Sequence, residues 1–97
     1  MVNLNTLAKN CQEIAAKRGK ITSDLAHWPS AGSISEELME FIRADEEKPS
    51  EHLPQYTEAQ EELADILIVC LTELDRRGVD IEEIIIDKIA FNKTRIP

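Results

Sequence analysis

Five carboxylates in two short groups are the residues of this chain best suited to chemistry. Glu36, Glu37 and Glu40 form the pattern E-E-x-x-E, and after a gap of 21 residues Glu62 and Asp65 form E-x-x-D. Residues three or four apart lie on the same face of a helix, so two helices could hold these carboxylates toward one point. Crowded carboxylates repel unless a cation lies among them, and oxygen ligands select a hard cation such as Mg²⁺ or Mn²⁺. The two groups therefore predict a divalent metal site that supports phosphate chemistry.

Either acidic group alone is more often a solvated helix face than a metal site. On a helical projection of about 100° per residue, Glu37 flanks the apolar stripe of its helix. Glu62 falls inside an apolar arc, between Ile66 and Val69, and Asp65 lies at the edge of that arc. A charge inside an apolar arc needs a partner or a metal. The position of Glu62 therefore favours a function over a solvated face.

A third group lies near the end of the chain. Lys88, Asn92 and Arg95 have the spacing i, i+4, i+7, which places them on one face of a helix whose first part carries Ile81 and Ile84 there. An ammonium, an amide and a guanidinium on one face suit a polyphosphate. The alternative is a frayed helix end whose cations complement the helix macrodipole.

Four helical patterns must position these groups, and no strand pattern competes with them. Apolar spacing and caps predict helices from about residue 5 to 18, from the cap at Ser33 to about 45, from the cap at Thr57 to about 77, and from the cap at Asp80 to about 95. Loops are predicted over residues 20–32 and 46–55, which contain prolines. The fold class is therefore all-α, a four-helix bundle in a single domain, 1–97.

The third predicted helix is apolar on every side over residues 66–71. A helix that is apolar on all sides is buried on all sides. Three other short helices cannot easily enclose it, so this run predicts a partner subunit and a bundle completed by oligomerisation.

Composition limits the partners and the compartment. The net charge of −8 argues against a nucleic-acid backbone as partner, although a bound cation would still admit a nucleotide. No segment is apolar enough to span a membrane, and the first residues do not resemble a secretory signal, which predicts a cytoplasmic protein. Cys11 and Cys70 lie on apolar helix faces and are expected to be reduced core thiols.

Taken in order, E-E-x-x-E, E-x-x-D and K-x-x-x-N-x-x-R resemble the MazG-like family of all-α nucleoside triphosphate pyrophosphohydrolases. The stretch from Gln55 to Arg95 is especially similar to the small MazG-like proteins of phages and bacteria. The resemblance implies a helical homodimer or homotetramer. It also implies Mg²⁺-dependent hydrolysis of a (deoxy)nucleoside triphosphate to the monophosphate and pyrophosphate, in nucleotide-pool control or house-cleaning.

The resemblance also implies roles for individual residues. Glu37, Glu40, Glu62 and Asp65 would hold Mg²⁺, with Mn²⁺ as a substitute, and Glu36 would be a further ligand or the base that orients water. Lys88, Asn92 and Arg95 would contact phosphate or sugar. Trp28, in the predicted first loop, could stack on a base or pack on the bundle.

Two other functions stay open at this point. One is a phosphoribosyl-ATP pyrophosphohydrolase-like enzyme, which has similar acidic motifs; the Lys88, Asn92, Arg95 ending favours the MazG-like type. The other is a non-catalytic helical interaction module that binds metal only incidentally. Release of pyrophosphate from nucleotides with Mg²⁺ would separate both enzymes from the module.

Overall fold

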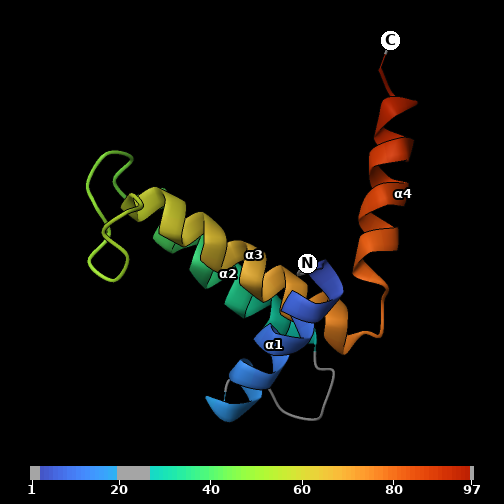
Figure 1. Cartoon of the computed structure of the whole chain (residues 1–97), viewed down its shortest axis with the longest axis horizontal. Helices are drawn as coiled ribbons and strands as arrows, with labels where there is room; N and C mark the ends of the chain where they lie inside the picture. Colours follow the sequence, from blue (N-terminus) through green and yellow to red (C-terminus); the bar gives the residue numbers. More distant parts are fainter. Residues whose placement is uncertain (1–2, 20–26, 97) are drawn as a thin grey trace. The chain divides into compact units, whose positions relative to one another are not determined.

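The structure is a computed structural model that describes residues 3–19 and 27–96, the side chains of residues 27–30 excepted. It contains four helices, α1 (Leu4–Lys17), α2 (His27–Arg43), α3 (Glu58–Arg76) and α4 (Ile81–Lys93), shown in Figure 1. Within the described ranges no strand forms, and an isolated bridge joins Pro49 and Thr57. The predicted all-α class is therefore confirmed.

The helix that carries E-E-x-x-E begins earlier than the sequence predicts. It starts at His27, so the second part of the predicted loop 20–32 is helical, and Ser33 lies inside the helix and does not cap it. Pro29 does not prevent this, because it falls in the first turn, where its missing N–H would have no helical partner. The local capping signal at Ser33 therefore did not mark the true start.

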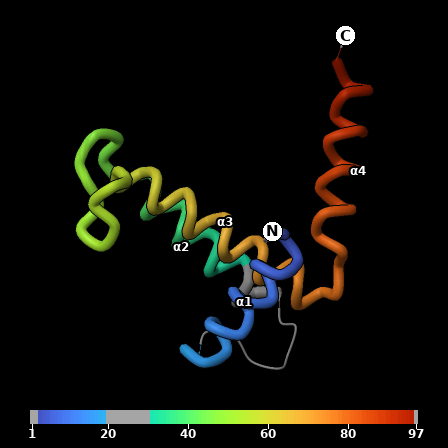
Figure 2. Tube along the Cα trace, in the orientation of Figure 1, coloured from blue at the N-terminus to red at the C-terminus, as the bar shows by residue number. Residues whose placement is uncertain are grey.

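One compact unit contains α2 and α3 as far as Cys70. The two helices run side by side in this unit, and the loop between them turns back on itself (Figure 2). Ser50 N donates to the Tyr56 carbonyl at 2.8 Å, and Glu58 N donates to the Lys48 carbonyl at 2.9 Å. These bonds close the loop at the start of α3.

The start of α3 agrees with its predicted cap. Thr57 N donates to Gln60 Oε1 at 2.9 Å, and Gln60 N donates to Thr57 Oγ1 at 3.2 Å. This reciprocal pair is a capping box, which satisfies two N–H groups that have no partner within the helix. The cap fixes where α3 begins, and therefore the height of Glu62 along it.

The second compact unit contains α1, the end of α3 from Leu71, and α4. Its buried core consists of Ala8, Leu71 and Ile81, with Leu4, Leu74 and Ile85 packed against it. Asn5 Oδ1 accepts a hydrogen bond from Ile81 N at 2.8 Å, and Asn5 Nδ2 donates to Asp80 Oδ1 at 3.1 Å. Asp80 also accepts from Glu83 N, so the predicted cap of α4 is present.

The apolar run of α3 is only partly covered within one chain. Leu71 is 4% exposed, whereas Leu67 and Ile68 are 54% and 44% exposed. The predicted partner subunit stays a prediction, and these two residues are where it would pack. None of the helices in the described ranges is long and apolar enough to cross a membrane. Cys11 and Cys70 are free, half-buried thiols.

Candidate metal site

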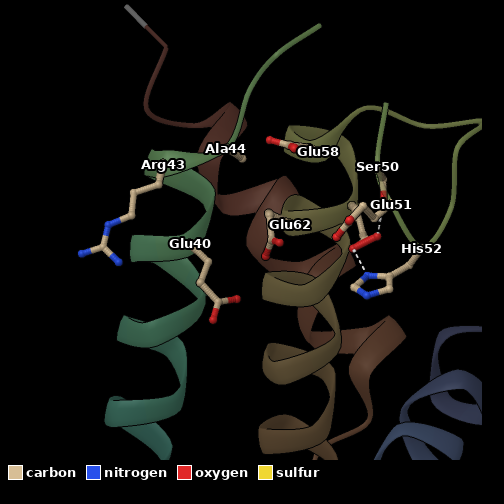
Figure 3. Close-up of a pocket in the computed structure, with 9 residues that line it drawn as sticks. Glu40, Arg43, Ala44, Ser50, Glu51, His52, Glu58 and Glu62 are labelled. Atoms are coloured by element: carbon tan, nitrogen blue, oxygen red, sulfur yellow. Dashed lines mark hydrogen bonds and ion pairs between the residues drawn. The ribbon is translucent and has the colours of Figure 1, made fainter. Parts of the chain in front are cut away.

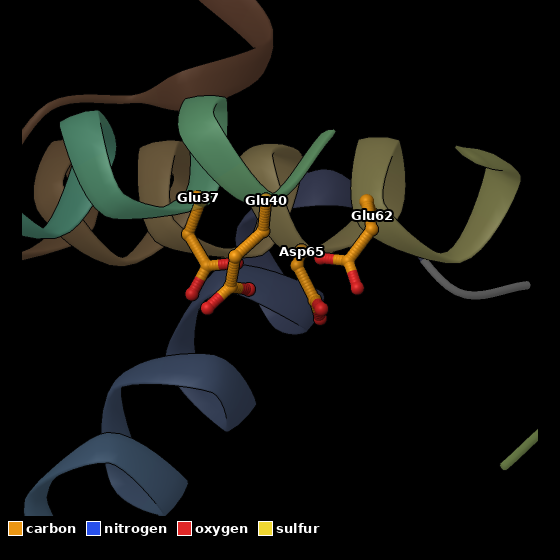
Figure 4. Close-up of side chains that lie close together, drawn as sticks. All are labelled: Glu37, Glu40, Glu62 and Asp65. Atoms are coloured by element: carbon orange, nitrogen blue, oxygen red, sulfur yellow. The ribbon is translucent and has the colours of Figure 1, made fainter. Parts of the chain in front are cut away.

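Four of the five predicted carboxylates come together between α2 and α3. Glu37 and Glu40 of α2 and Glu62 and Asp65 of α3 each offer a carboxylate oxygen, and these four atoms all lie within 4.8 Å of one another. Figure 4 shows the four side chains directed toward a common region from the two helices. The i, i+3 spacing produces this arrangement, because it places both carboxylates of each helix on one face. We call these four residues the acidic group.

Glu62 is the most perturbed member of the acidic group. Burial, followed by the negative charges of Asp65, Glu40 and Glu37, raises the pKa of its carboxyl to about 7. Its Oε2 atom is buried and has no hydrogen-bond partner among the residues that the structure describes. A buried carboxylate oxygen in this setting needs a proton or a cation. The position of Glu62 inside an apolar arc, inferred from the sequence, therefore has the expected electrostatic consequence.

The acidic group fits a hard divalent cation. All four donors are carboxylates, and neither His nor Cys belongs to the group, so its chemistry suits Mg²⁺ or Mn²⁺ better than Zn²⁺. The buried Oε2 of Glu62 offers a ligand atom that no described residue uses. The residues that would hold the cation are therefore Glu37, Glu40, Glu62 and Asp65.

Glu36 does not join the acidic group. Its side chain is exposed on α2. Adjacent residues of a helix point about 100° apart, so Glu36 and Glu37 cannot both face α3 in the same way. Its predicted role as a further ligand or base stays a prediction.

A hollow of about 300 Å³ adjoins the acidic group and shares Glu40 and Glu62 with it. The remaining lining residues come from the end of α2, the following loop and the first turns of α3 (Figure 3): Arg43, Ala44, Ser50, Glu51, His52, Glu58 and Glu61. Carboxylates dominate this lining, so a bound cation would be needed before phosphate could enter it.

Glu61 is hydrogen-bonded by the loop and does not belong to the acidic group. The buried Ser50 donates its hydroxyl to Glu61 Oε1, and His52 Nδ1 lies 3.4 Å from Glu61 Oε2. The hydrogen bond from Ser50, assisted by His52, lowers the pKa of Glu61. These contacts were missed at the sequence level, where His52 had no assigned role. No spacing signal could have found them, because they depend on the path of the loop.

The third predicted group lies in the other compact unit, with Lys88 and Asn92 on α4 and Arg95 just beyond the end of that helix at Lys93. Lys88, Asn92 and Arg95 are all exposed within this chain, although Ile81 at the start of the same helix is buried. Lys88 and Arg95 both approach the ring of Phe91, with Nζ at 4.8 Å and Cζ at 5.9 Å from its centroid. Their contact with substrate stays a prediction.

Trp28, the other predicted substrate residue, lies in the first turn of α2 and not in a loop as predicted. Its side chain lies outside the described residues, so the structure does not test base stacking.

Comparison with known proteins gives a match to a family but none to an individual protein. Neither the curated proteins nor the solved structures contain a significant match to the chain. The profile of the phosphoribosyl-ATP pyrophosphohydrolase family, by contrast, matches residues 12–90. The matched stretch includes the whole acidic group and Lys88, and it ends before Asn92 and Arg95.

The family match confirms the all-α NTP pyrophosphatase superfamily inferred from the motifs and leaves the small MazG-like type as a prediction. Most of the chain lies within the match, including both acidic motifs. The chain therefore belongs to the phosphoribosyl-ATP pyrophosphohydrolase family, within the MazG-like all-α NTP pyrophosphatase superfamily.

Proposed function

We propose that this protein hydrolyses a nucleotide between its α and β phosphorus atoms and releases pyrophosphate, with Mg²⁺ or Mn²⁺ as its cation. Members of the family are pyrophosphohydrolases that act on acid anhydrides. The observation that carries the proposal is the acidic group, whose four carboxylate oxygens lie within 4.8 Å of one another. Such a group suits a divalent cation, and a nucleotide's polyphosphate is a natural ligand of that cation.

The proposed reaction is a simple displacement. The oxygen of a water molecule bonds to the α phosphorus, the bond from that phosphorus to the bridging oxygen breaks, and pyrophosphate leaves with the bridging oxygen. A cation held by the acidic group would neutralise phosphate charge and lower the pKa of a bound water. The four carboxylates bind and orient this centre, and Glu36 is our candidate for accepting the proton of the water.

Two substrates fit this reaction equally well. A (deoxy)nucleoside triphosphate is favoured by the Lys88, Asn92, Arg95 ending, which resembles small MazG-like enzymes. Phosphoribosyl-ATP is favoured by the family match over residues 12–90. In both substrates the same phosphoanhydride is cleaved. Because the match extends through both compact units, it also supports our assignment of residues 1–97 to one catalytic domain.

A substrate panel tests the proposal. The four deoxynucleoside triphosphates, dUTP, ATP and phosphoribosyl-ATP are incubated with Mg²⁺ or with EDTA. Orthophosphate is measured with and without added inorganic pyrophosphatase, so that the increment reports pyrophosphate. Reaction in ¹⁸O-labelled water then shows whether the label enters the monophosphate, as attack at the α phosphorus requires.

The outcomes separate the candidate functions. Equal release of pyrophosphate and monophosphate, stopped by EDTA, supports the proposed reaction, and the preferred substrate selects between the two enzymes. Orthophosphate as the primary product overturns the reaction type. Absence of turnover on every substrate favours a non-catalytic interaction module.

A further inference from the structure

The register between α2 and α3 decides whether the four carboxylates of the acidic group can meet. Helical periodicity places the two carboxylates of each helix on one face, but it does not fix how far one helix is displaced along the other. The acidic group and the loop of residues 44–57 belong to the same compact unit. The contacts that join the end of α2 to the start of α3 therefore set the height of one carboxylate pair against the other.

Glu58, the first residue of α3, makes such a contact through its side chain. Its Oε1 accepts a hydrogen bond from Asp45 N at 3.1 Å, and the Asp45 carbonyl accepts one from Ala59 N at 3.1 Å. Asp45 lies two residues beyond the end of α2. Glu58 lies one helical turn before Glu62 on α3. The Glu58–Asp45 contact therefore joins the two helices close to the acidic group.

Without a cation, the acidic group opposes this register. Four carboxylate oxygens within 4.8 Å of one another repel, and a small displacement of either helix would relieve the repulsion. A metal site needs its ligands held to within about 0.5 Å of the productive geometry. A contact that keeps the register in the metal-free protein therefore raises cation affinity, because binding does not have to restore the register.

We infer that Glu58 is a positioning residue of the metal site, which acts through the backbone N–H of Asp45 to hold α2 and α3 in register. The inference rests on the proposed function, since it concerns the cation that this function requires. Glu58 does not itself belong to the acidic group. Its hydrogen bond to Asp45, and not its negative charge, carries the effect.

Two simpler roles of Glu58 make different predictions. If its charge only attracts cations, a variant that keeps a carboxylate should bind them as the wild-type protein does. If its ion pair with Lys48, at 3.4 Å, only stabilises the loop, the melting temperature should change and the cation affinity of the folded protein should not. The positioning role requires an acceptor oxygen at the reach of a glutamate or glutamine side chain.

The test compares Glu58→Gln, Glu58→Asp and Glu58→Ala, with Lys48→Gln as the matched control. Glutamine keeps the acceptor oxygen and loses the charge, aspartate keeps the charge on a shorter side chain, and alanine loses both. Lys48→Gln removes the ion pair with Glu58 and keeps the Lys48 carbonyl that accepts from Glu58 N. Titration with Mn²⁺ alone, with free Mn²⁺ measured by electron paramagnetic resonance, gives the affinity, and thermal melts give the stability.

The expected pattern is rescue by glutamine and not by aspartate. We expect Glu58→Ala and Glu58→Asp to weaken Mn²⁺ binding about three- to tenfold, up to the net value of one hydrogen bond. Glu58→Gln and Lys48→Gln should stay within about twofold of the wild-type protein, since an exposed charge contributes little. If the alanine variant does not fold, the contrast between glutamine and aspartate still decides the outcome.

The two proposals fail in different ways. Turnover of nucleotide, with the same Mn²⁺ affinity in all the variants, overturns the role of Glu58 and leaves the proposed function intact. Loss of Mn²⁺ affinity in Glu58→Asp but not in Glu58→Gln, without turnover of any nucleotide, supports the role of Glu58 and contradicts the proposed function. Equal losses in these two variants, a loss in Glu58→Gln alone, or no Mn²⁺ binding by the wild-type protein also overturn the inference.

Discussion

The two halves of α3 differ in how completely their charges are satisfied within the chain. In the first half, Glu62 has a buried oxygen without a hydrogen-bond partner among the described residues, and its pKa is raised to about 7. In the second half, Glu73 is also buried, but Arg76 Nη1 donates to both of its carboxylate oxygens at 3.0 and 3.2 Å. Arg77 Nη1 adds a bond of 2.7 Å. Similar residues on one helix therefore have opposite electrostatic settings.

The apolar side chains of α3 show the same difference. Leu71 is buried with Ala8 and Ile81, whereas Leu67 and Ile68 of the first half are largely exposed. The second half is thus complete within one chain, in both charge and apolar cover. In the first half, the buried oxygen of Glu62 lacks a hydrogen-bond partner among the described residues, and Leu67 and Ile68 lack apolar cover. A perturbed carboxylate beside exposed apolar side chains is where ligand and partner binding are expected.

Removing a carboxylate of the acidic group should give the largest effect. We expect Glu37→Gln, Glu40→Gln, Glu62→Gln and Asp65→Asn each to reduce turnover by roughly a thousandfold or more, since each removes a predicted metal ligand. Each change also relieves repulsion, so the metal-free protein should melt at the same or a higher temperature. Steady-state kinetics and thermal melts measure both effects.

Glu46→Gln is the matched control for these variants. Glu46 is an exposed residue of the loop before α3 and lies outside the acidic group, so this change also removes one negative charge. We expect it to retain wild-type turnover. Early melting and loss of helicity in the four variants would show that the acidic group is structural, and the contrast with Glu73 would disappear.

Charges placed in the two halves of α3 should act differently. Leu67→Asp should dissociate a homo-oligomer, a dimer or tetramer, into folded monomers, because each exposed leucine that is covered contributes roughly 1.5–3 kcal/mol. Leu71→Asp should unfold the protein, because an unpaired charge would enter the core. Light scattering across a dilution series and circular dichroism distinguish dissociation from unfolding.

Leu67→Met serves as the control, since it keeps an apolar side chain of similar volume and should preserve the oligomer. A wild-type protein that remains a folded, active monomer of 11.0 kDa at micromolar concentration would contradict the predicted interface. Activity of the Leu67→Asp monomer then reports whether the site needs the partner.

The acidic group could be predicted from the sequence because helical periodicity alone decides which residues share a face. The spacing of Glu62 and Asp65 was enough to predict that they share a helix face, and the cap at Thr57 fixed the start of that helix. Glu36 shows the limit of such reasoning, since its neighbour Glu37 joins the group and it does not. A motif written as letters gives both residues the same weight, whereas a helix turns them apart.

Features that depend on chain path or on tertiary competition could not be predicted. The bonds from Ser50 and His52 to Glu61 join a loop to a helix, and no period relates them. The start of α2 at His27 was missed because Pro29 is compatible with a first helical turn. The contacts of Lys88 and Arg95 with the ring of Phe91 were not predicted, because the sequence analysis assigned both cations to a substrate.

Glu73 provides the counterpart to the acidic-group variants. Glu73→Gln removes the negative charge to which the guanidinium of Arg76, whose side chain is 6% exposed, donates two hydrogen bonds. Breaking a buried ion pair from one side typically costs about 3 kcal/mol, so we expect a loss of that size in the free energy of unfolding. The remaining folded protein should keep its turnover number. Denaturant titration measures the loss.

Glu83→Gln is the control for Glu73→Gln. Glu83 is exposed in the first turn of α4, and its replacement should change stability by no more than about 0.5 kcal/mol. Equal stability of the two variants would mean that the ion pairs of Glu73 with Arg76 and Arg77 stabilise the fold no more than a surface charge does. The proposed difference between the two halves of α3 would then be wrong.

The smallest expected effect is a pH dependence that belongs to Glu62. Its folded-state pKa, about 7, lies above the usual 4.5. This group therefore stabilises the metal-free protein fully below about pH 4.5, and the contribution is lost as pH rises through about 7. Because a cation binds the deprotonated carboxylate, apparent Mg²⁺ affinity should fall by up to about tenfold per pH unit below that value and level off above it.

Thermal melts with EDTA and with saturating Mg²⁺, from about pH 5 to about pH 8, test this prediction. The contribution of Glu62 to metal-free stability should decline toward the alkaline end, and Mg²⁺ should reduce that decline by replacing the proton. Glu62→Gln should reduce both the decline of metal-free stability with pH and the pH dependence of Mg²⁺ binding. Glu73→Gln should leave both pH dependences unchanged. If Mg²⁺ affinity were independent of pH in both the wild-type protein and Glu62→Gln, the proton and the cation would not compete for Glu62. The proposed contrast between Glu62 in the first half of α3 and the ion-paired Glu73 in the second half would then be wrong.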